Sequence, residues 1–140
     1  MEMGYSDIDL VEESYVKYGS VSSYKELIVW QKSMSLVKEI YIITKNMPDE
    51  ERFGLTSQIR RAAVSIPSNI AEGWGRNSKG SYINHLKISN GSLCETETQI
   101  LIIEMLNFLD NSKLIASKNL LQECSKMLKS IIDKLEAHTK

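Results

Sequence analysis

The clearest signal in the chain is a hydrophobic repeat that steps alternately by three and four residues. This spacing places apolar side chains on one side of a helix. It predicts four helices, over about residues 24–46, 55–72, 78–109 and 113–138. Because short loops between long helices place neighbours antiparallel, we expect an all-α fold, an antiparallel up-down-up-down four-helix bundle that occupies residues 24–140.

The repeat is best developed in the second, third and fourth helices. The positions predicted to face the core are Leu55, Ile59, Ala62, Ala63, Ile66 and Ile70 in the second helix, Tyr82, Leu86, Ser89, Leu93, Thr96, Ile100 and Ile103 in the third, and Leu121, Cys124, Leu128, Ile131 and Leu135 in the fourth.

The first helix carries two adjacent apolar stripes, which is more than a peripheral helix of a monomeric bundle needs. Either the helix is deeply buried within one subunit, or part of it faces another subunit. The stripes consist of Leu27, Trp30, Met34, Val37, Tyr41 and Thr44, and of Val29, Leu36, Ile40, Ile43 and Met47.

Five local signals refine the helix ends and contacts. Pro67 lies inside the second helix, where it removes a backbone hydrogen bond for no reason visible in the sequence. Gly73 is the expected left-handed cap of that helix. Ser78 is the expected N-cap of the third helix, and Asn111 or Ser112 that of the fourth. The small residues of segment 89–92 predict close approach by another helix.

The first 23 residues form an acidic N-terminal extension. They carry five acidic residues and one basic residue, for a net charge of −4, whereas residues 24–140 carry thirteen acidic and sixteen basic residues, for a net charge of +3. A short helix with Ser6 as cap and Gly19 as stop, or a flexible tail, fits this extension equally well.

Composition places the chain among ordinary soluble domains. It has 140 residues, 42% of them apolar and 25% charged. No apolar run approaches the roughly 18 residues of a membrane span, and no secretory signal is visible. The two cysteines, Cys94 and Cys124, have no paired spacing, as is usual in a reducing cytosol. We therefore expect a cytoplasmic protein without membrane contact.

The residues that carry chemistry in helical bundles are missing. His85 and His138 lack the glutamate three residues earlier that di-iron bundles use, and neither has a second ligand at zinc spacing. Cys94 and Cys124 are interpreted as small core residues. No nucleophile motif or phosphate loop is present, so we predict no catalytic residue, no metal, no cofactor and no enzymatic activity.

Basic residues are the remaining candidates. Arg60, Arg76, Lys79 and Lys87 could contact phosphates, with Trp74 and Tyr82 as stacking groups. Arg61 is interpreted instead as the partner of an acidic residue such as Glu95 or Glu72, in a buried structural ion pair inside the assembly. The plainer alternative is a solvated surface of mixed charge, because a net charge of +3 does not by itself predict nucleic-acid binding.

Three segments carry a family resemblance: YKELIVWQK (24–32), FGLTSQIRRAAVSIPSNIAEG (53–73) and NGSLCETET (90–98). Together they resemble the bacterial 23S-rRNA intervening-sequence proteins, and the SIPSNIAEG portion is highly specific. Pro67 is a feature of that family. Its members usually begin near Tyr24, so the extension of residues 1–23 is additional.

The resemblance implies a bundle that assembles as a ring, typically a homopentamer. The family is similar in fold to the accessory variability proteins of diversity-generating retroelements, which bind a reverse transcriptase and nucleic acid. It has no established catalytic residues. We therefore predict a non-enzymatic homo-oligomer associated with RNA or DNA, with a protein-interaction scaffold for a reverse transcriptase or another RNA-handling protein as the alternative.

Overall fold

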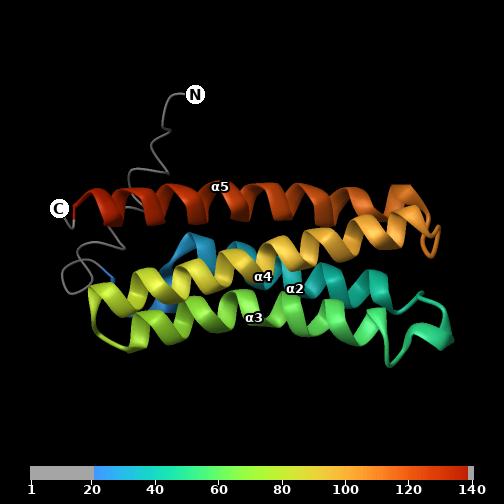
Figure 1. The fold of residues 1–140 in the computed structure, drawn as a ribbon, viewed down its shortest axis with the longest axis horizontal. Helices are drawn as coiled ribbons and strands as arrows, with labels where there is room; N and C mark the ends of the chain where they lie inside the picture. Colours follow the sequence, from blue (N-terminus) through green and yellow to red (C-terminus); the bar gives the residue numbers. More distant parts are fainter. Residues whose placement is uncertain (1–20, 139–140) are drawn as a thin grey trace.

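The computed structural model describes residues 21–138, which form four long helices joined by short connections (Figure 1). These are α2 (Ile28–Thr44), α3 (Leu55–Gly75), α4 (Lys79–Met105) and α5 (Ile115–Ala137). Three short 3-10 helices, η1 (Tyr24–Glu26), η2 (Asp49–Glu51) and η3 (Asn111–Leu114), precede α2, α3 and α5. No strand occurs within residues 21–138, so the all-helical prediction is confirmed.

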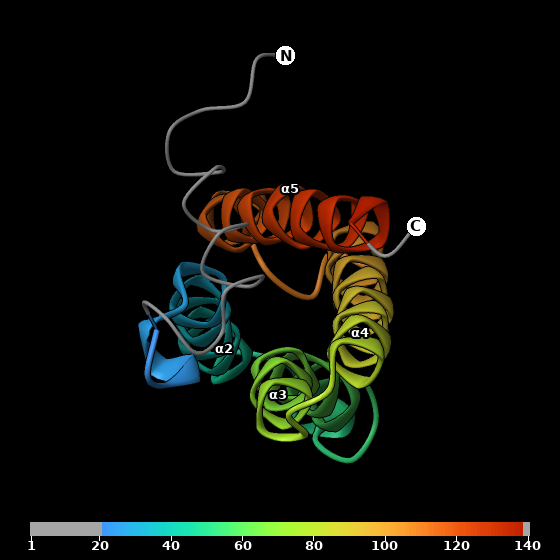
Figure 2. The ribbon, with the colours of Figure 1, turned by 90° about the vertical axis from the view of Figure 1, so that its left-hand side faces the viewer.

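The helices enclose one core, with α2 and α4 each packed against both α3 and α5 (Figure 2). Every position predicted to face the core in the second, third and fourth helices is buried. The two stripes of α2 differ. Val29, Leu36, Ile40, Ile43 and Met47 are all buried, whereas Met34 and Tyr41 of the other stripe are 43% and 39% exposed. Part of α2 therefore presents an apolar surface outside the subunit core.

Small residues bring α3 and α4 close together, as segment 89–92 predicted. The buried Ser89 donates a hydrogen bond of 2.9 Å from its Oγ to the carbonyl oxygen of Ile66. The Ser92 Oγ donates to the Ser65 Oγ at 2.9 Å. Because serine side chains are small, the two helix backbones can approach closely. The serine hydroxyls form hydrogen bonds between the helices, which leucines at these positions could not do.

The same contacts surround Pro67, whose place in the helix the sequence left unexplained. Three consecutive carbonyl oxygens before the proline accept side-chain hydrogen bonds: Val64 from Ser68 at 2.8 Å, Ser65 from the Asn69 amide at 2.8 Å, and Ile66 from Ser89. The carbonyl that loses its N–H partner at a proline is that of the fourth residue before it, here Ala63. These side-chain bonds therefore surround Pro67 and tie it to α4, but they do not replace the missing bond.

Gly73 is not the left-handed cap that the sequence predicted. It lies within α3, and the left-handed conformation falls on Asn77, with φ of 62°. Gly73 is needed for a different reason. A Cβ at this position would stand 2.6 Å from the Cβ of His85, so only glycine lets α4 pass this closely.

The helix starts confirm one predicted cap and correct another. The Ser78 Oγ accepts from the amide of Ser81 at 3.3 Å, as expected of an N-cap. Neither Asn111 nor Ser112 caps the fourth helix: the N-cap of α5 is Leu114, which makes no side-chain cap hydrogen bond, and the capping side chain upstream is Asp110. Its carboxylate accepts from the amide of Ser112 at 3.0 Å and begins η3 one turn before α5. A carboxylate satisfies that amide as well as a hydroxyl would.

The predicted extension lies almost entirely outside the described residues. Of it, the structure describes only Val21, Ser22 and Ser23. Val21 is buried in the core, and Ser23 caps η1 by accepting from the amide of Lys25 at 3.2 Å. The packing of the bundle therefore includes Val21, three residues before the predicted boundary.

Candidate nucleic-acid interface

The four predicted phosphate-binding residues do not form one surface. Arg76 and Lys79 lie at the α3–α4 connection, whereas Arg60 lies in the first half of α3, toward the opposite end of the bundle (Figure 1). The sixteen residues from Arg60 to Arg76 correspond to about 24 Å of helix. Lys79 is half-buried at the first position of α4.

Two of these residues are already paired with acidic residues. Arg76 forms a salt bridge of 2.9 Å with Glu72, and this hydrogen bond, with the charge of His85, lowers the pKa of the Glu72 carboxyl. Lys87 pairs with Glu136 of α5 at 3.2 Å. The predicted stacking groups are also occupied. Trp74 and Tyr82 are buried and meet edge to face, with ring centroids 6.0 Å apart.

The structure contains no buried pair between Arg61 and Glu95. Both side chains are exposed, and no salt bridge joins them within the described part of the chain. The Glu95 carboxylate instead accepts from the Gln99 amide at 3.4 Å. The α3–α4 contact consists of serines and glycine, so the two charged side chains remain on the outer surfaces of their helices. Within the described residues of one subunit the two side chains form no ion pair, and a pair formed in the assembled protein stays a prediction.

A different basic surface forms between α2 and the start of α3. It is an open groove of about 510 Å³. We call it the arginine groove. Its lining contains three arginines and no carboxylate, and consists of Tyr41, Arg52, Phe53, Thr56, Ser57, Arg60, Arg61 and Val64.

Arg60 is held in the groove by α2. Its Nε donates to the Thr44 Oγ1 at 2.9 Å, and its guanidinium lies 4.6 Å from the centre of the Tyr41 ring. Both contacts leave its two terminal nitrogens without a carboxylate partner. In the described residues, none of Arg52, Arg60 and Arg61 makes a salt bridge, whereas Arg76 does. Within residues 21–138, no salt bridge therefore compensates the positive charge of the groove.

Two aromatic rings border the same groove. Phe53 is 89% exposed, the largest exposed fraction among the exposed apolar side chains, and the Arg52 guanidinium lies 5.3 Å from the centre of its ring. Tyr41 is 39% exposed beside Arg60. Each ring thus stands next to a guanidinium, an arrangement suited to stacking with a planar group and contact with an anion.

The floor of the groove holds an unpaired polar group. The Thr56 side chain is only 7% exposed, and its Oγ1 has no hydrogen-bond partner among the described residues. Thr56 lies in the first turn of α3, whose N-cap Gly54 offers no side-chain acceptor. The Glu51 Oε1 accepts from the Leu55 amide there at 3.4 Å. Helix starts favour anions, because their first amides point outward.

Sequence reasoning missed Arg52, Phe53 and Thr56. A signal was present, because Arg52-Phe53 lies in the loop before α3, seven to nine residues before Arg60 and Arg61. The sequence could not predict that Tyr41 belongs to this surface, because Tyr41 meets Arg60 only through the packing of α2 on α3.

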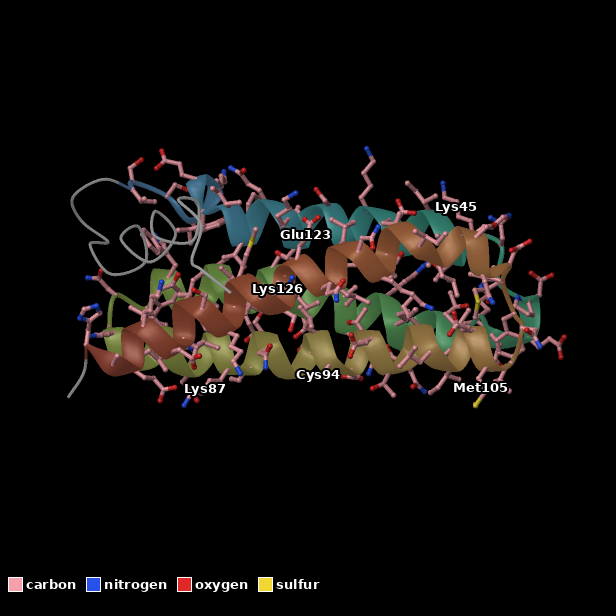
Figure 3. All side chains as sticks on the ribbon, turned by 90° about the horizontal axis from the view of Figure 1, so that it is seen from above. Lys45, Lys87, Cys94, Met105, Glu123 and Lys126 are labelled. Atoms are coloured by element: carbon pink, nitrogen blue, oxygen red, sulfur yellow. The ribbon has the colours of Figure 1, made fainter. Side chains whose placement is uncertain are left out.

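The remaining candidates for chemistry lie apart. Cys124 is buried, as predicted, and burial raises the pKa of its thiol to about 12. Cys94 is exposed on α4, so its assignment to the core is wrong (Figure 3). No group of three His, Cys, Asp or Glu residues within the described chain is placed to hold a metal ion. None of the helices in residues 21–138 is long and apolar enough to cross a membrane.

Fold and groove together define a small four-helix protein with one arginine-lined surface. The chain belongs to the 23S rRNA-intervening sequence protein family, which it matches over residues 25–130. This confirms the resemblance of the three sequence segments.

A solved structure of similar fold is a protein of unknown function from the S23 ribosomal protein family of Bacteroides thetaiotaomicron. It is 28% identical, with a TM-score of 0.70, and the match covers 76% of this chain and 96% of that one. No curated protein sequence matches the chain.

Proposed function

We propose that this protein is a non-enzymatic RNA-binding subunit that contacts phosphates through the arginine groove. The observation that carries the proposal is the groove itself, with three arginines, no carboxylate in its lining and an unpaired hydroxyl at its floor. Arginine is suited to phosphate contacts because its planar guanidinium donates two hydrogen bonds in parallel. The family is named for intervening sequences of 23S rRNA, which favours RNA over DNA as the ligand.

Binding should follow the arginines and fall with salt, because phosphate contacts release counterions. The assay is fluorescence anisotropy of a labelled RNA at two salt concentrations. The double variant Arg52→Glu with Arg61→Glu should weaken binding at least tenfold. Lys126→Glu with Lys129→Glu is the matched control, since it makes the same charge change at exposed lysines of α5.

The predicted pair Arg76 and Lys79 gives a second comparison. If Arg76→Glu with Lys79→Glu weakens binding and the groove variant does not, RNA binds at the α3–α4 connection and the groove assignment fails. If neither the full chain nor a truncation lacking residues 1–20, which keeps the buried Val21, binds RNA at low salt, the RNA-binding function itself is wrong.

The second part of the proposal is assembly. We propose that the bundle, with its helices antiparallel, is the repeating unit of a homo-oligomeric ring. Three apolar side chains of α4, Ile88, Leu101 and Met105, are 46%, 50% and 69% exposed, and Met105 points away from the bundle (Figure 3). Met34 and Tyr41 are exposed on α2. A ring needs two different surfaces that fit each other, because its interface is heterologous.

Light scattering tests the ring directly. The full chain should show a mass several times 15.9 kDa. Leu101→Glu should lower that mass, whereas Ile115→Glu, at a residue 58% exposed at the start of α5, should not. A monomer at micromolar concentration would contradict assembly. The exposed apolar side chains of α4 could instead bind another protein. If the larger mass appears only when a second protein such as a reverse transcriptase is present, the alternative function, a protein-interaction scaffold, is favoured.

A further inference from the structure

We infer that the arginine groove selects unpaired nucleotides, with Phe53 stacking on a base and Thr56 receiving the adjoining phosphate. The inference rests on the proposed RNA binding and specifies its ligand. The Phe53 side chain lines the groove and is 89% exposed. An aromatic ring without apolar cover has most of its surface in water, and a base is the planar partner that the neighbouring arginines would bring to it.

Thr56 provides the second, independent observation. Its hydroxyl is buried beneath the groove without a partner, which is rare because an unpaired buried polar group destabilises the fold. The hydroxyl lies in the first turn of α3, where the Leu55 amide is already taken by the Glu51 carboxylate at 3.4 Å, so the positive charge for a phosphate comes from the arginines. Arg60 and Arg61 follow one turn later on the same helix. A phosphate oxygen seated here would accept from the hydroxyl and from the guanidinium groups.

The ring and the hydroxyl are close in the chain. Phe53 precedes Thr56 by three residues, across the start of α3. A single nucleotide could place its base on the Phe53 ring and its phosphate near Thr56, provided that the base is free to turn outward. In a duplex the base faces are covered by their neighbours in the stack, and proteins therefore read the faces of bases in single strands and loops. The combination of ring and hydroxyl thus selects unpaired RNA.

The test compares a labelled single-stranded RNA with the same strand annealed to its complement, using the full chain in fluorescence anisotropy. The single strand should bind at least tenfold more tightly than the duplex. Phe53→Leu should weaken single-strand binding about tenfold, the effect typical of losing one stacked base, and leave duplex binding unchanged. Phe53→Trp keeps a ring and should restore the affinity.

Thr56→Val separates ligand contact from structure. It preserves the shape of the side chain and removes the unpaired hydroxyl, so the melting temperature should rise, whereas the affinity for the single strand should fall several-fold. A purely structural Thr56 would change stability without changing affinity.

The outcomes distinguish this inference from the proposed function. Equal affinity for single strand and duplex, with no effect of Phe53→Leu, overturns the selection of unpaired nucleotides while RNA binding stands. Loss of oligomer mass in Phe53→Leu with unchanged RNA affinity assigns the ring to a subunit contact and also overturns it. Absence of binding to either RNA removes both.

Discussion

Ser89 of α4 donates its buried hydroxyl to the carbonyl oxygen of Ile66 in α3, the residue directly before Pro67. The bond joins the two helices at the one place where proline interrupts the backbone ladder of α3. It also explains why a polar residue occupies a core position of the heptad pattern in α4. A larger apolar side chain would fill the space that lets the helices approach.

Ser89→Ala should therefore destabilise the protein moderately, and Ser89→Leu severely. Loss of the hydrogen bond corresponds to about 1 kcal/mol, or about 4 °C in melting temperature. The leucine adds overpacking of about 1–3 kcal/mol. Circular dichroism during heating measures both effects. Ser35→Ala is the control, because the Ser35 hydroxyl is exposed and donates only to the carbonyl oxygen of Gln31 in its own helix. Equal loss at Ser35 and Ser89 would contradict the role of the interhelical bond.

Gly73 and Gly91 should respond to alanine in opposite directions. At Gly73 the new Cβ would lie 2.6 Å from the His85 Cβ, so α4 must shift. We expect a loss of about 1–3 kcal/mol. At Gly91 nothing lies within 4 Å, and alanine should stabilise the helix by up to about 1 kcal/mol.

Urea denaturation of both glycine variants measures the two effects. A stable Gly73→Ala variant would show that the helices are farther apart than described. Destabilisation by Gly91→Ala would indicate that a neighbouring subunit packs on α4.

The four helices and their core-facing positions could be predicted from the sequence, because an apolar residue at a heptad position needs only to be buried against the neighbouring helices. The predictions at Gly73 and Cys94 failed for a shared reason. Each was assigned from local chemistry, whereas its environment depends on the neighbouring helix. The α4 backbone decides what fits at Gly73, and Cys94 lies on a face of α4 that no helix of the subunit covers. The arginine groove was missed similarly, since Tyr41 and Phe53 come to line the same groove only through the packing of α2 on α3.

Arg60 and Arg61 are neighbours that should differ in their effect on stability. Arg60→Met removes the hydrogen bond to Thr44 and the contact with the Tyr41 ring, for a loss of about 1–2 kcal/mol. Arg61→Met removes an exposed side chain with no salt bridge to the described residues, and should change stability by less than about 0.5 kcal/mol.

Urea denaturation of the two arginine variants is the measurement. A large loss at Arg61 that is partly recovered by adding Glu95→Gln would instead establish the predicted ion pair, formed in the assembled protein.

Cys124 should make the protein less stable as pH rises above neutrality. Burial, reinforced by the Glu123 charge, raises the pKa of its thiol to about 12 in the native state. The unfolded chain loses the same proton near the ordinary thiol pKa of about 8.5. Between these values the native state binds more protons than the unfolded state, so the free energy of unfolding falls by about 1.4 kcal/mol per pH unit.

Urea denaturation from pH 8 to pH 10, a range chosen to begin at about the ordinary thiol pKa, measures this dependence. Cys124→Ala should be less stable at pH 8 because it leaves a small void, but its stability should fall less steeply with pH. Cys94→Ala, at an exposed position, should keep the steep dependence of the parent. The parent and Cys124→Ala differ in a single ionisable group, so the difference in slope isolates Cys124. Identical slopes for the parent and Cys124→Ala would mean that the thiol ionises as readily in the folded protein as in the unfolded chain.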